Sequence, residues 1–242
     1  MAVEVFLGGG SSLQINWIWK PNFRLVKEII GIGLPAFVMM SATSLMVVSV
    51  NRVLVSYGGE GEIAIFGIIN RLLTFSDMPI SGIVQGMQPI IGFNHGAGLA
   101  ERVGRTFKLC AYIATGIAMI TWIIIMTIPG LLMNIFTADH EMIKNGSEAL
   151  RWIFFVTPMI GLPMVASGLY QALGKARKAF MLSMSRRVLF LLPFVFILPH
   201  FFGLKGVWLS FSLGDGMAFL LTAIILLKDR KPLFASCRLE EN

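Results

Sequence analysis

The chain has 242 residues, of which 56% are hydrophobic and only 14% are charged, and its mean hydropathy is +0.77. A soluble domain of this length needs far more polar surface, so the composition excludes a water-soluble globular fold and indicates a membrane protein. The formal net charge of +7 comes from basic residues dispersed over several loops, which argues against a nucleic-acid partner.

Residues 1–28 are expected to form a cytoplasmic linker that precedes the membrane domain. Residues 3–7 are too short for the hydrophobic region of a signal peptide, and Glu4 interrupts them. The run Gly8-Gly9-Gly10-Ser11-Ser12 has the composition of a flexible linker. Residues 17–27 combine Trp with Lys and Arg, which is typical of an amphipathic segment on a membrane surface.

Six long apolar stretches follow, separated by short polar loops. Each is close to the roughly 20 residues that cross a hydrocarbon core of about 30 Å. Because a backbone inside lipid must satisfy its own hydrogen bonds, each stretch predicts a transmembrane helix. The stretches are 29–51, 64–92, 108–130, 152–173, 183–203 and 207–227. The sequence therefore predicts an all-α membrane protein, with a six-helix bundle over 29–227 and a cytoplasmic tail over 228–242.

Basic residues predict the orientation of this bundle. Six spans place both termini on one side, and 15 Lys and Arg residues fall on that side against four on the other. Because Lys and Arg accumulate in cytoplasmic loops, both termini are predicted to be cytoplasmic. The 15 residues include Arg186 and Arg187, near the start of the fifth stretch.

No catalytic residue, metal ligand or cofactor is predicted. The two cysteines, Cys110 and Cys237, do not make a disulfide framework and are not expected to be catalytic thiols. His95 has no second metal-binding residue close in the sequence, and no nucleotide-binding Gly-x-x-x-x-Gly-Lys-Ser/Thr motif occurs.

The most specific motif is Gln85–Gly98, at the end of the second stretch. Pro89 frees a backbone carbonyl, which predicts a helix kink. Gln85 and Gln88 share one helix face, and carboxamides within a membrane are expected to face a cavity or a partner helix. Either they contact substrate, or they only hold helices together. Three glycines are expected to end this helix: Gly92, Gly96 and Gly98.

Two acidic residues lie inside the predicted spans, and both are candidates for ion coupling. A charge at this depth costs about 3 kcal/mol, so Asp77 and Asp215 are expected to face protein or water. For Asp77, cation or substrate contact stands against a structural role, which is either a buried pair with an Arg of a neighbouring helix or capping near Pro79; the structural role is preferred. For Asp215, the small neighbours Gly214 and Gly216 allow a structural partner, and Asp215 is the second candidate, after Asp77, for ion coupling.

A promiscuous apolar pocket is predicted from the methionine and aromatic side chains of the spans. Met adapts to varied shapes, and aromatic rings stack on flat cations. For any one of these residues, lipid exposure or helix packing is the alternative. The predicted substrate-binding residues are Met39, Met40, Asn70, Arg71, Phe75, Met78, Gln85, Gln88 and Met159.

Several further motifs occur in a fixed order along the chain. They are Gly33-Leu34-Pro35, Asn51-Arg52, Tyr57-Gly58-Gly59, Phe75-Ser76-Asp77-Met78-Pro79, Gln85–Gly98, Glu101-Arg102-Val103, Phe136-Thr137-Ala138-Asp139, Tyr170-Gln171-Ala172-Leu173-Gly174 and Gly206-Val207-Trp208-Leu209. In this series the chain resembles the C-terminal half, helices seven to twelve, of a multidrug and toxic compound extrusion (MATE) transporter of the bacterial multidrug exporter branch. The motif residues with an expected structural role are Pro35, Pro79, Pro89, Gly92, Asn94 and Gly96.

The resemblance implies one lobe of a twelve-helix transporter whose substrate cleft lies between two lobes. It implies a secondary active antiporter of the bacterial inner membrane, not an enzyme, that exports organic cations and drugs in exchange for H⁺ or Na⁺. The expected partners are membrane lipid and an N-terminal six-helix lobe. Some branches carry coupling carboxylates in helices seven and ten, but stretches 29–51 and 152–173 contain no Asp or Glu, so such a site is not expected.

Three alternatives remain open. A lipid-linked oligosaccharide flippase lobe has the same fold, with more Arg in its cavity. An intramembrane aspartyl protease could use Asp77 and Asp215 as a dyad, although Ser212-Leu213-Gly214-Asp215 lacks the Gly-x-Gly-Asp pattern of those enzymes. A non-functional truncated product is the third alternative.

Overall fold

The computed structural model describes residues 23–235, with the side chains of 24–36, 39 and 230–235 left aside. The predicted linker over 1–22, and the side chains of Pro35 and Met39, therefore lie outside the described residues. In chain order the elements are α2 Phe23–Gly58, α3 Glu60–Gly96, α4 Ala100–Thr127, α5 Pro129–Asn134, α6 His140–Phe154, the 3₁₀ turn η1 Thr157–Met159, α7 Gly161–Ala172, α8 Ala176–Met184, the π-helical turn η2 Ser185–Leu191, α9 Leu192–Ile197, α10 Pro199–Phe202 and α11 Leu204–Ala235.

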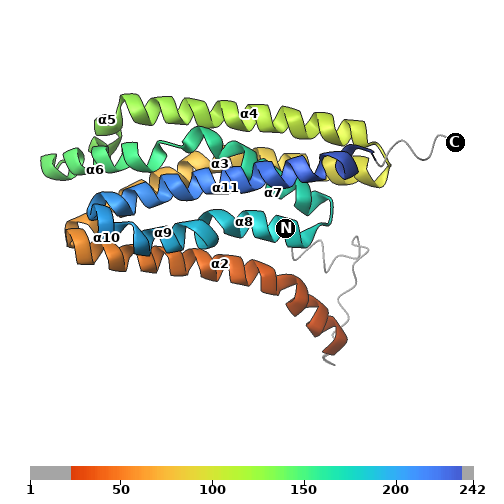
Figure 1. The fold of residues 1–242 in the computed structure, drawn as a ribbon, viewed down its shortest axis with the longest axis horizontal. Coiled ribbons are helices and arrows are strands. Elements are labelled where there is room, and N and C mark those ends of the chain that lie inside the picture. The colour runs from red at the N-terminus through yellow and green to blue at the C-terminus, as the bar shows by residue number, and fades with distance from the viewer. Residues whose placement is uncertain (1–22, 236–242) are drawn as a thin grey trace, which may run out of the picture. The chain divides into compact units, whose positions relative to one another are not determined.

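The predicted spans fall within these helices. Four described helices or helix runs are long and apolar enough to cross a membrane: α3, α4, Ala176–Phe202 and Leu204–Asp229. The first predicted span, 29–51, lies within α2. The connections α3–α4 and α7–α8 lie at one end of the bundle, and α5–α6 and α10–α11 at the other (Figure 1). This alternation is the one that the predicted topology requires.

Two predicted spans are not single straight helices. The fourth, 152–173, is broken: His140–Met159 and Gly161–Ala172 meet at 51°. The break coincides with the 3₁₀ turn around Pro158, which has no N–H to continue the helical hydrogen bonds. The fifth, 183–203, contains the π turn η2 and then Pro193 and Pro199, which divide it into short helices.

The predicted end of the second span also needs correction. Gly92 does not end the helix, because α3 continues through it to Gly96. The chain turns at Gly98, whose φ of 73° is in the left-handed region that glycine tolerates. Asn94 donates from its side chain to the Ile90 carbonyl at 2.7 Å within the last turns of α3. The kink expected at Pro89 stays a prediction.

Two separate apolar cores hold the helices together. The first joins α2, α3, α6, α9 and α11, together with one buried residue each from α4, α5 and η2. Its fully buried residues include Val50, Leu54, Ile69, Leu150, Phe154 and Val195. The second joins α3, α4, α7 and α8, and includes Met87, Ile91, Ala114, Val165, Leu169 and Tyr170. Along α3, the first core ends at Ile69 and the second begins at Ile80. The segment between them contains the polar residues Asn70, Thr74 and Asp77.

The crossing of α7 and α4 depends on Gly161. A Cβ at this position would lie 2.9 Å from the Thr115 backbone nitrogen and 3.0 Å from the Ala114 carbonyl carbon. Backbone atoms cannot move aside as the end of a flexible side chain can. The first residue of α7 is therefore restricted to glycine if the two helices are to keep this distance.

We expect Gly161→Ala to destabilise the protein by about 1–3 kcal/mol, because the added methyl group overpacks a contact between two backbones. The matched control is Gly116→Ala in α4, where an added Cβ has no neighbour within 4 Å. That control should be neutral or slightly stabilising, since Ala favours helix more than Gly by up to about 1 kcal/mol. Thermal unfolding of the purified protein in detergent measures both, and equal midpoints for the two variants would contradict the packing argument.

Candidate functional site

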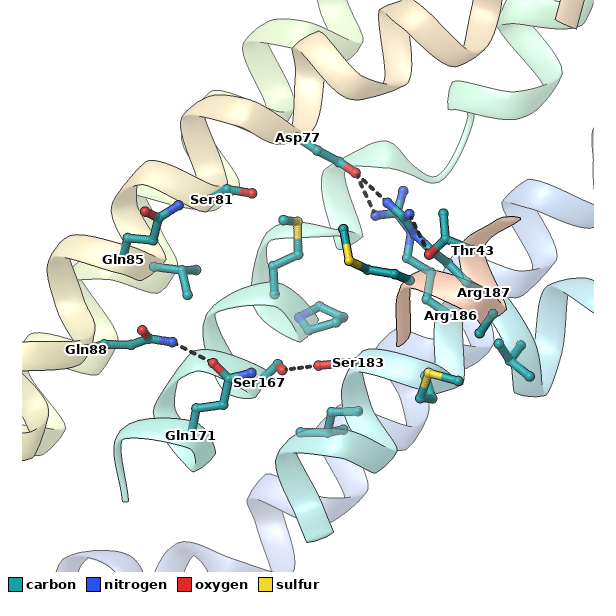
Figure 2. A pocket seen from close by; sticks show the side chains of 18 residues that line it. Thr43, Asp77, Ser81, Gln85, Gln88, Ser167, Gln171, Ser183, Arg186 and Arg187 are labelled. Atoms are coloured by element: carbon teal, nitrogen blue, oxygen red, sulfur yellow. Dashed lines mark hydrogen bonds and ion pairs between the residues drawn. The ribbon is translucent and has the colours of Figure 1, made fainter. Parts of the chain in front are cut away.

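One face of α3 carries a polar stripe. Its members follow one another at intervals of three or four residues, so they lie above one another on the helix. They are Asn70, Thr74, Asp77, Ser81, Gln85 and Gln88. All six line one or both of two cavities, with volumes of about 540 and 450 Å³. Four of them, from Asp77 to Gln88, extend from α3 toward the facing helices in Figure 2.

The two cavities adjoin, because they share part of their lining. The shared residues are Thr43, Asp77, Ser81, Gln85, Arg186 and Arg187. The wall opposite α3 comes from α7, α8 and η2, with Thr43 contributed by α2. We call the two together the polar cavity. Apolar side chains such as Met40, Met78 and Leu191 complete its surface.

Arg186 is the centre of a charged network in the cavity wall. Its Nε donates to Asp215 Oδ1, and its Nη1 donates to Asp77 Oδ2 at 3.3 Å. The three side chains are only 18%, 8% and 17% exposed for Arg186, Asp215 and Asp77 respectively. One guanidinium therefore links α3 and α11 through η2, and neither carboxylate is buried without a cation.

Arg187 is the outer member of the same network. Its Nη2 lies 3.6 Å from Asp77 Oδ2, and its Nη1 donates to the Thr43 hydroxyl at 3.5 Å. Its side chain is 42% exposed, more than that of any other charged residue in the network. Figure 2 shows Asp77 directed at both guanidinium groups.

The local backbone explains how two consecutive arginines reach one carboxylate. Residues 185–191 form a π-helical turn, a wider geometry than the α-helix that is frequent at functional sites. Pro193 follows it and has no N–H to donate to the Leu189 carbonyl, so a regular α-helical bond is missing there. On the other side Gly214 allows α11 to approach: a Cβ there would lie 3.5 Å from the Arg186 carbonyl oxygen.

Two hydrogen bonds between uncharged side chains join the other helices of the cavity wall. Gln88 Nε2 donates to Gln171 Oε1 at 2.7 Å and joins α3 to α7. The hydroxyls of Ser167 and Ser183 lie 2.6 Å apart and join α7 to α8. Gln85 lines the cavity and is exposed, so its carboxamide faces the open space between these links.

The structure brings only part of the predicted substrate-binding set to the polar cavity. Met40, Asn70, Met78, Gln85 and Gln88 line it. Arg71, Phe75 and Met159 are exposed and are not among the residues that line it. The substrate role of all nine residues stays a prediction.

Of the two structural roles expected for Asp77, the structure shows the ion pair with an Arg from a neighbouring helix; its role in ion coupling stays a prediction. The structural partner expected for Asp215 is also found, in the same Arg186. The assignment of Arg186 and Arg187 to a cytoplasmic loop was wrong, because both face the polar cavity between the two cores. Without Arg186 and Arg187, 13 Lys and Arg residues fall on the predicted cytoplasmic side against four on the other side, so the predicted orientation is unchanged.

Several cavity residues could not be found from the motifs alone: Thr43, Ser81, Ser167, Ser183, Arg186 and Arg187. The spacing of polar residues along 70–88 would have added Ser81, because it continues the stripe of Asp77 and Gln85. No such periodic signal marks the two arginines.

Comparison with known proteins identifies the family to which the chain belongs. Residues 35–197 match the MatE family. Multidrug export protein MepA of Staphylococcus aureus strain MSSA476 is 29% identical over 231 residues, covering 94% of this chain and 51% of that protein. MepA of Staphylococcus haemolyticus strain JCSC1435 is 26% identical over 207 residues, or 86% of this chain and 45% of that protein. The chain spans about half the length of the curated relatives it matches.

A solved structure with the same fold is that of the MATE multidrug transporter DinF-BH in complex with a ligand. It is 40% identical, with a TM-score of 0.78, and the match covers 96% of this chain and 52% of that one. The predicted fold, an all-helical membrane lobe that corresponds to half of a MATE transporter, is thereby confirmed.

We expect Arg186→Gln to destabilise the protein by about 3–5 kcal/mol, because it leaves Asp77 and Asp215 buried with a much weaker counter-charge. The triple variant Arg186→Gln, Asp77→Asn, Asp215→Asn should recover much of this loss, since no uncompensated charge remains. Arg105→Gln is the control: its pair with Glu101 is exposed, and it should change stability by less than about 1 kcal/mol. Unfolding midpoints in detergent give the order, and a triple variant no more stable than Arg186→Gln would refute the electrostatic explanation.

Proposed function

The chain belongs to the MatE family, and from this premise we propose that it forms one lobe of a secondary active multidrug exporter whose drug-binding cleft is lined in part by the polar cavity. The observation that supports the proposal is the stripe of polar side chains on α3, which faces open space between two apolar cores. Polar groups within a membrane protein characteristically mark a substrate or ion pathway. MepA is named a multidrug export protein, and DinF-BH is a multidrug transporter.

The other components of the proposal come from the family. The exporter exchanges drugs, organic cations among them, for H⁺ or Na⁺, and a second six-helix lobe on the N-terminal side supplies the facing wall of the cleft. Asp77 and Asp215 are the coupling candidates within this lobe. Protonation of Asp77 would weaken its pairs with Arg186 and Arg187, so an ion at this carboxylate could change the network that links α3 and α11.

A flippase lobe is the second candidate, because two arginines line the cavity. Both guanidinium groups contact Asp77, and Arg186 also contacts Asp215, so the wall as a whole is electrically balanced. A polyphosphate headgroup carries several negative charges and needs more uncompensated cations than this wall holds, whereas a drug with one charge or none does not. The protease alternative fits poorly, since Arg186 lies between the two aspartates and a shared proton needs adjacent carboxylates.

The function is tested by joining this chain to the half of DinF-BH that lies outside the match. In an efflux-deficient host, we expect the fusion to give energy-dependent efflux of ethidium, an organic cation. Asp77→Ala together with Gln88→Ala should reduce the efflux rate by about tenfold or more, the scale of one or two lost polar contacts. The 242-residue chain alone should give none, because alternating access needs two lobes. Full efflux by the doubly substituted fusion would remove the polar cavity from the drug pathway.

Both termini are proposed to be cytoplasmic, and cysteine labelling tests this orientation. In a background with Cys110→Ser and Cys237→Ser, Lys144→Cys should react with an impermeant maleimide in intact cells. Arg177→Cys, at the opposite end of the bundle, should react only after permeabilisation. Both side chains are exposed, unlike Glu62, which is buried and therefore unsuitable as a probe. Reaction at position 177 in intact cells would invert the proposed orientation.

A further inference from the structure

We propose that Arg187 is the recognition site for an anionic group, a carboxylate, sulfonate or phosphate, on an amphiphilic substrate in the polar cavity. The inference rests on the proposed function and deepens it, because it assigns a charge preference to this wall of the cleft. It follows from how differently the two neighbouring arginines are bound.

Arg186 is engaged on both sides. It donates to Asp215 through Nε and to Asp77 through Nη1, and its side chain is only 18% exposed. Its charge is thus neutralised within the wall, and a ligand could reach it only by breaking a buried pair. Arg186 therefore joins the helices, and its positive charge is compensated by two carboxylates.

Arg187 is engaged loosely. Its contacts with Asp77 at 3.6 Å and Thr43 at 3.5 Å are both at the long limit for polar interactions. Its Nε has no hydrogen-bond partner among the described residues, and 42% of the side chain is exposed, where it borders both parts of the cavity. A guanidinium with unused donors in fork geometry is the group that binds carboxylate, sulfonate or phosphate best.

The carboxylates of the cavity are not comparably accessible to a cationic substrate. Asp215 is 8% exposed and Asp77 17% exposed, and both accept from Arg186. A substrate cation would have to displace a buried guanidinium, whereas a substrate anion needs only the half-exposed Arg187. If Arg187 turns from Asp77 toward the anion, Asp77 still keeps Arg186, so no carboxylate is left buried alone.

Two fluorescent probes that differ by one charge test the assignment. 8-Anilinonaphthalene-1-sulfonate carries a sulfonate, and N-phenyl-1-naphthylamine has the same ring system without it. Each is titrated against the 242-residue chain in nanodiscs of phosphatidylcholine, and the signal from protein-free nanodiscs is subtracted. The saturable part gives a Kd for each probe.

Arg187→Gln should weaken binding of the sulfonate about tenfold, the scale of one charged hydrogen bond, and change the Kd of the neutral probe less than twofold. Asp77→Asn should act in the opposite direction, tightening sulfonate binding roughly two- to fivefold, because it frees Arg187 from a partly exposed pair. Partial unfolding would expose apolar surface and increase the binding of both probes, so only a gain confined to the sulfonate supports the assignment. Arg102→Gln, an exposed arginine at the start of α4, is the control and should change neither Kd.

The assignment would be overturned if Arg187→Gln changed the Kd of both probes equally, or changed neither. In that case, saturable binding of the neutral probe would still support the proposed function. If neither probe bound saturably to the unsubstituted chain, both proposals would fail. Repeating the titration with phosphatidylglycerol in the nanodiscs separates two sources of the anion. Arg187-dependent loss of sulfonate binding there would identify an anionic lipid as a competing occupant; its absence would leave the soluble amphiphile.

Discussion

A single guanidinium, that of Arg186, constrains the middle of this lobe. It lies where the two apolar cores end, and it is bonded to an aspartate on each of two long helices. Each of these charges would be costly inside a membrane protein without a partner. The helices that carry them can therefore pack only in a register that brings the three side chains together. Shape complementarity in the two cores then fixes the remaining degrees of freedom.

The polar cavity follows from that constraint. Asp77 must face η2, and so the residues one, two and three turns further along α3 face the same way. Ser81, Gln85 and Gln88 are consequently held in the cavity wall, where Gln88 meets Gln171 of α7. On the other side of η2, α11 can come close because Gly214, which has no side chain, lies against the backbone of Arg186. The same charged network thus holds the helices together and orients the polar residues of α3 toward the cavity.

The membrane helices could be predicted from the sequence, because the length and apolarity of a segment decide whether it can cross a bilayer. Sequence reasoning also found Asp77, Asp215, Gln85 and Gln88, because polar groups in an apolar stretch are conspicuous. It could not place Arg186 and Arg187. Two consecutive basic residues near the start of a span look like the end of a cytoplasmic loop, and only the π turn and the two aspartates show otherwise. The bend between α6 and α7 was missed for a related reason: an apolar stretch containing Pro158 has the same composition whether it is straight or broken.

The contacts within the charged network differ in strength, and the weaker ones are those that face the cavity. The contacts of Arg186 are buried and join α3 to α11, whereas those of Arg187 are long and face the cavity. Arg187 is the more exposed of the two arginines, so it is the one that a ligand or an ion in the cavity can reach. Exchange of partners at Arg187 can take place while Arg186 continues to compensate Asp77, so the wall can respond to its contents without leaving a buried charge unpaired. We infer that a fixed pair that maintains the fold, next to a loose pair whose partner can change, would allow this cavity to bind a molecule and then release it.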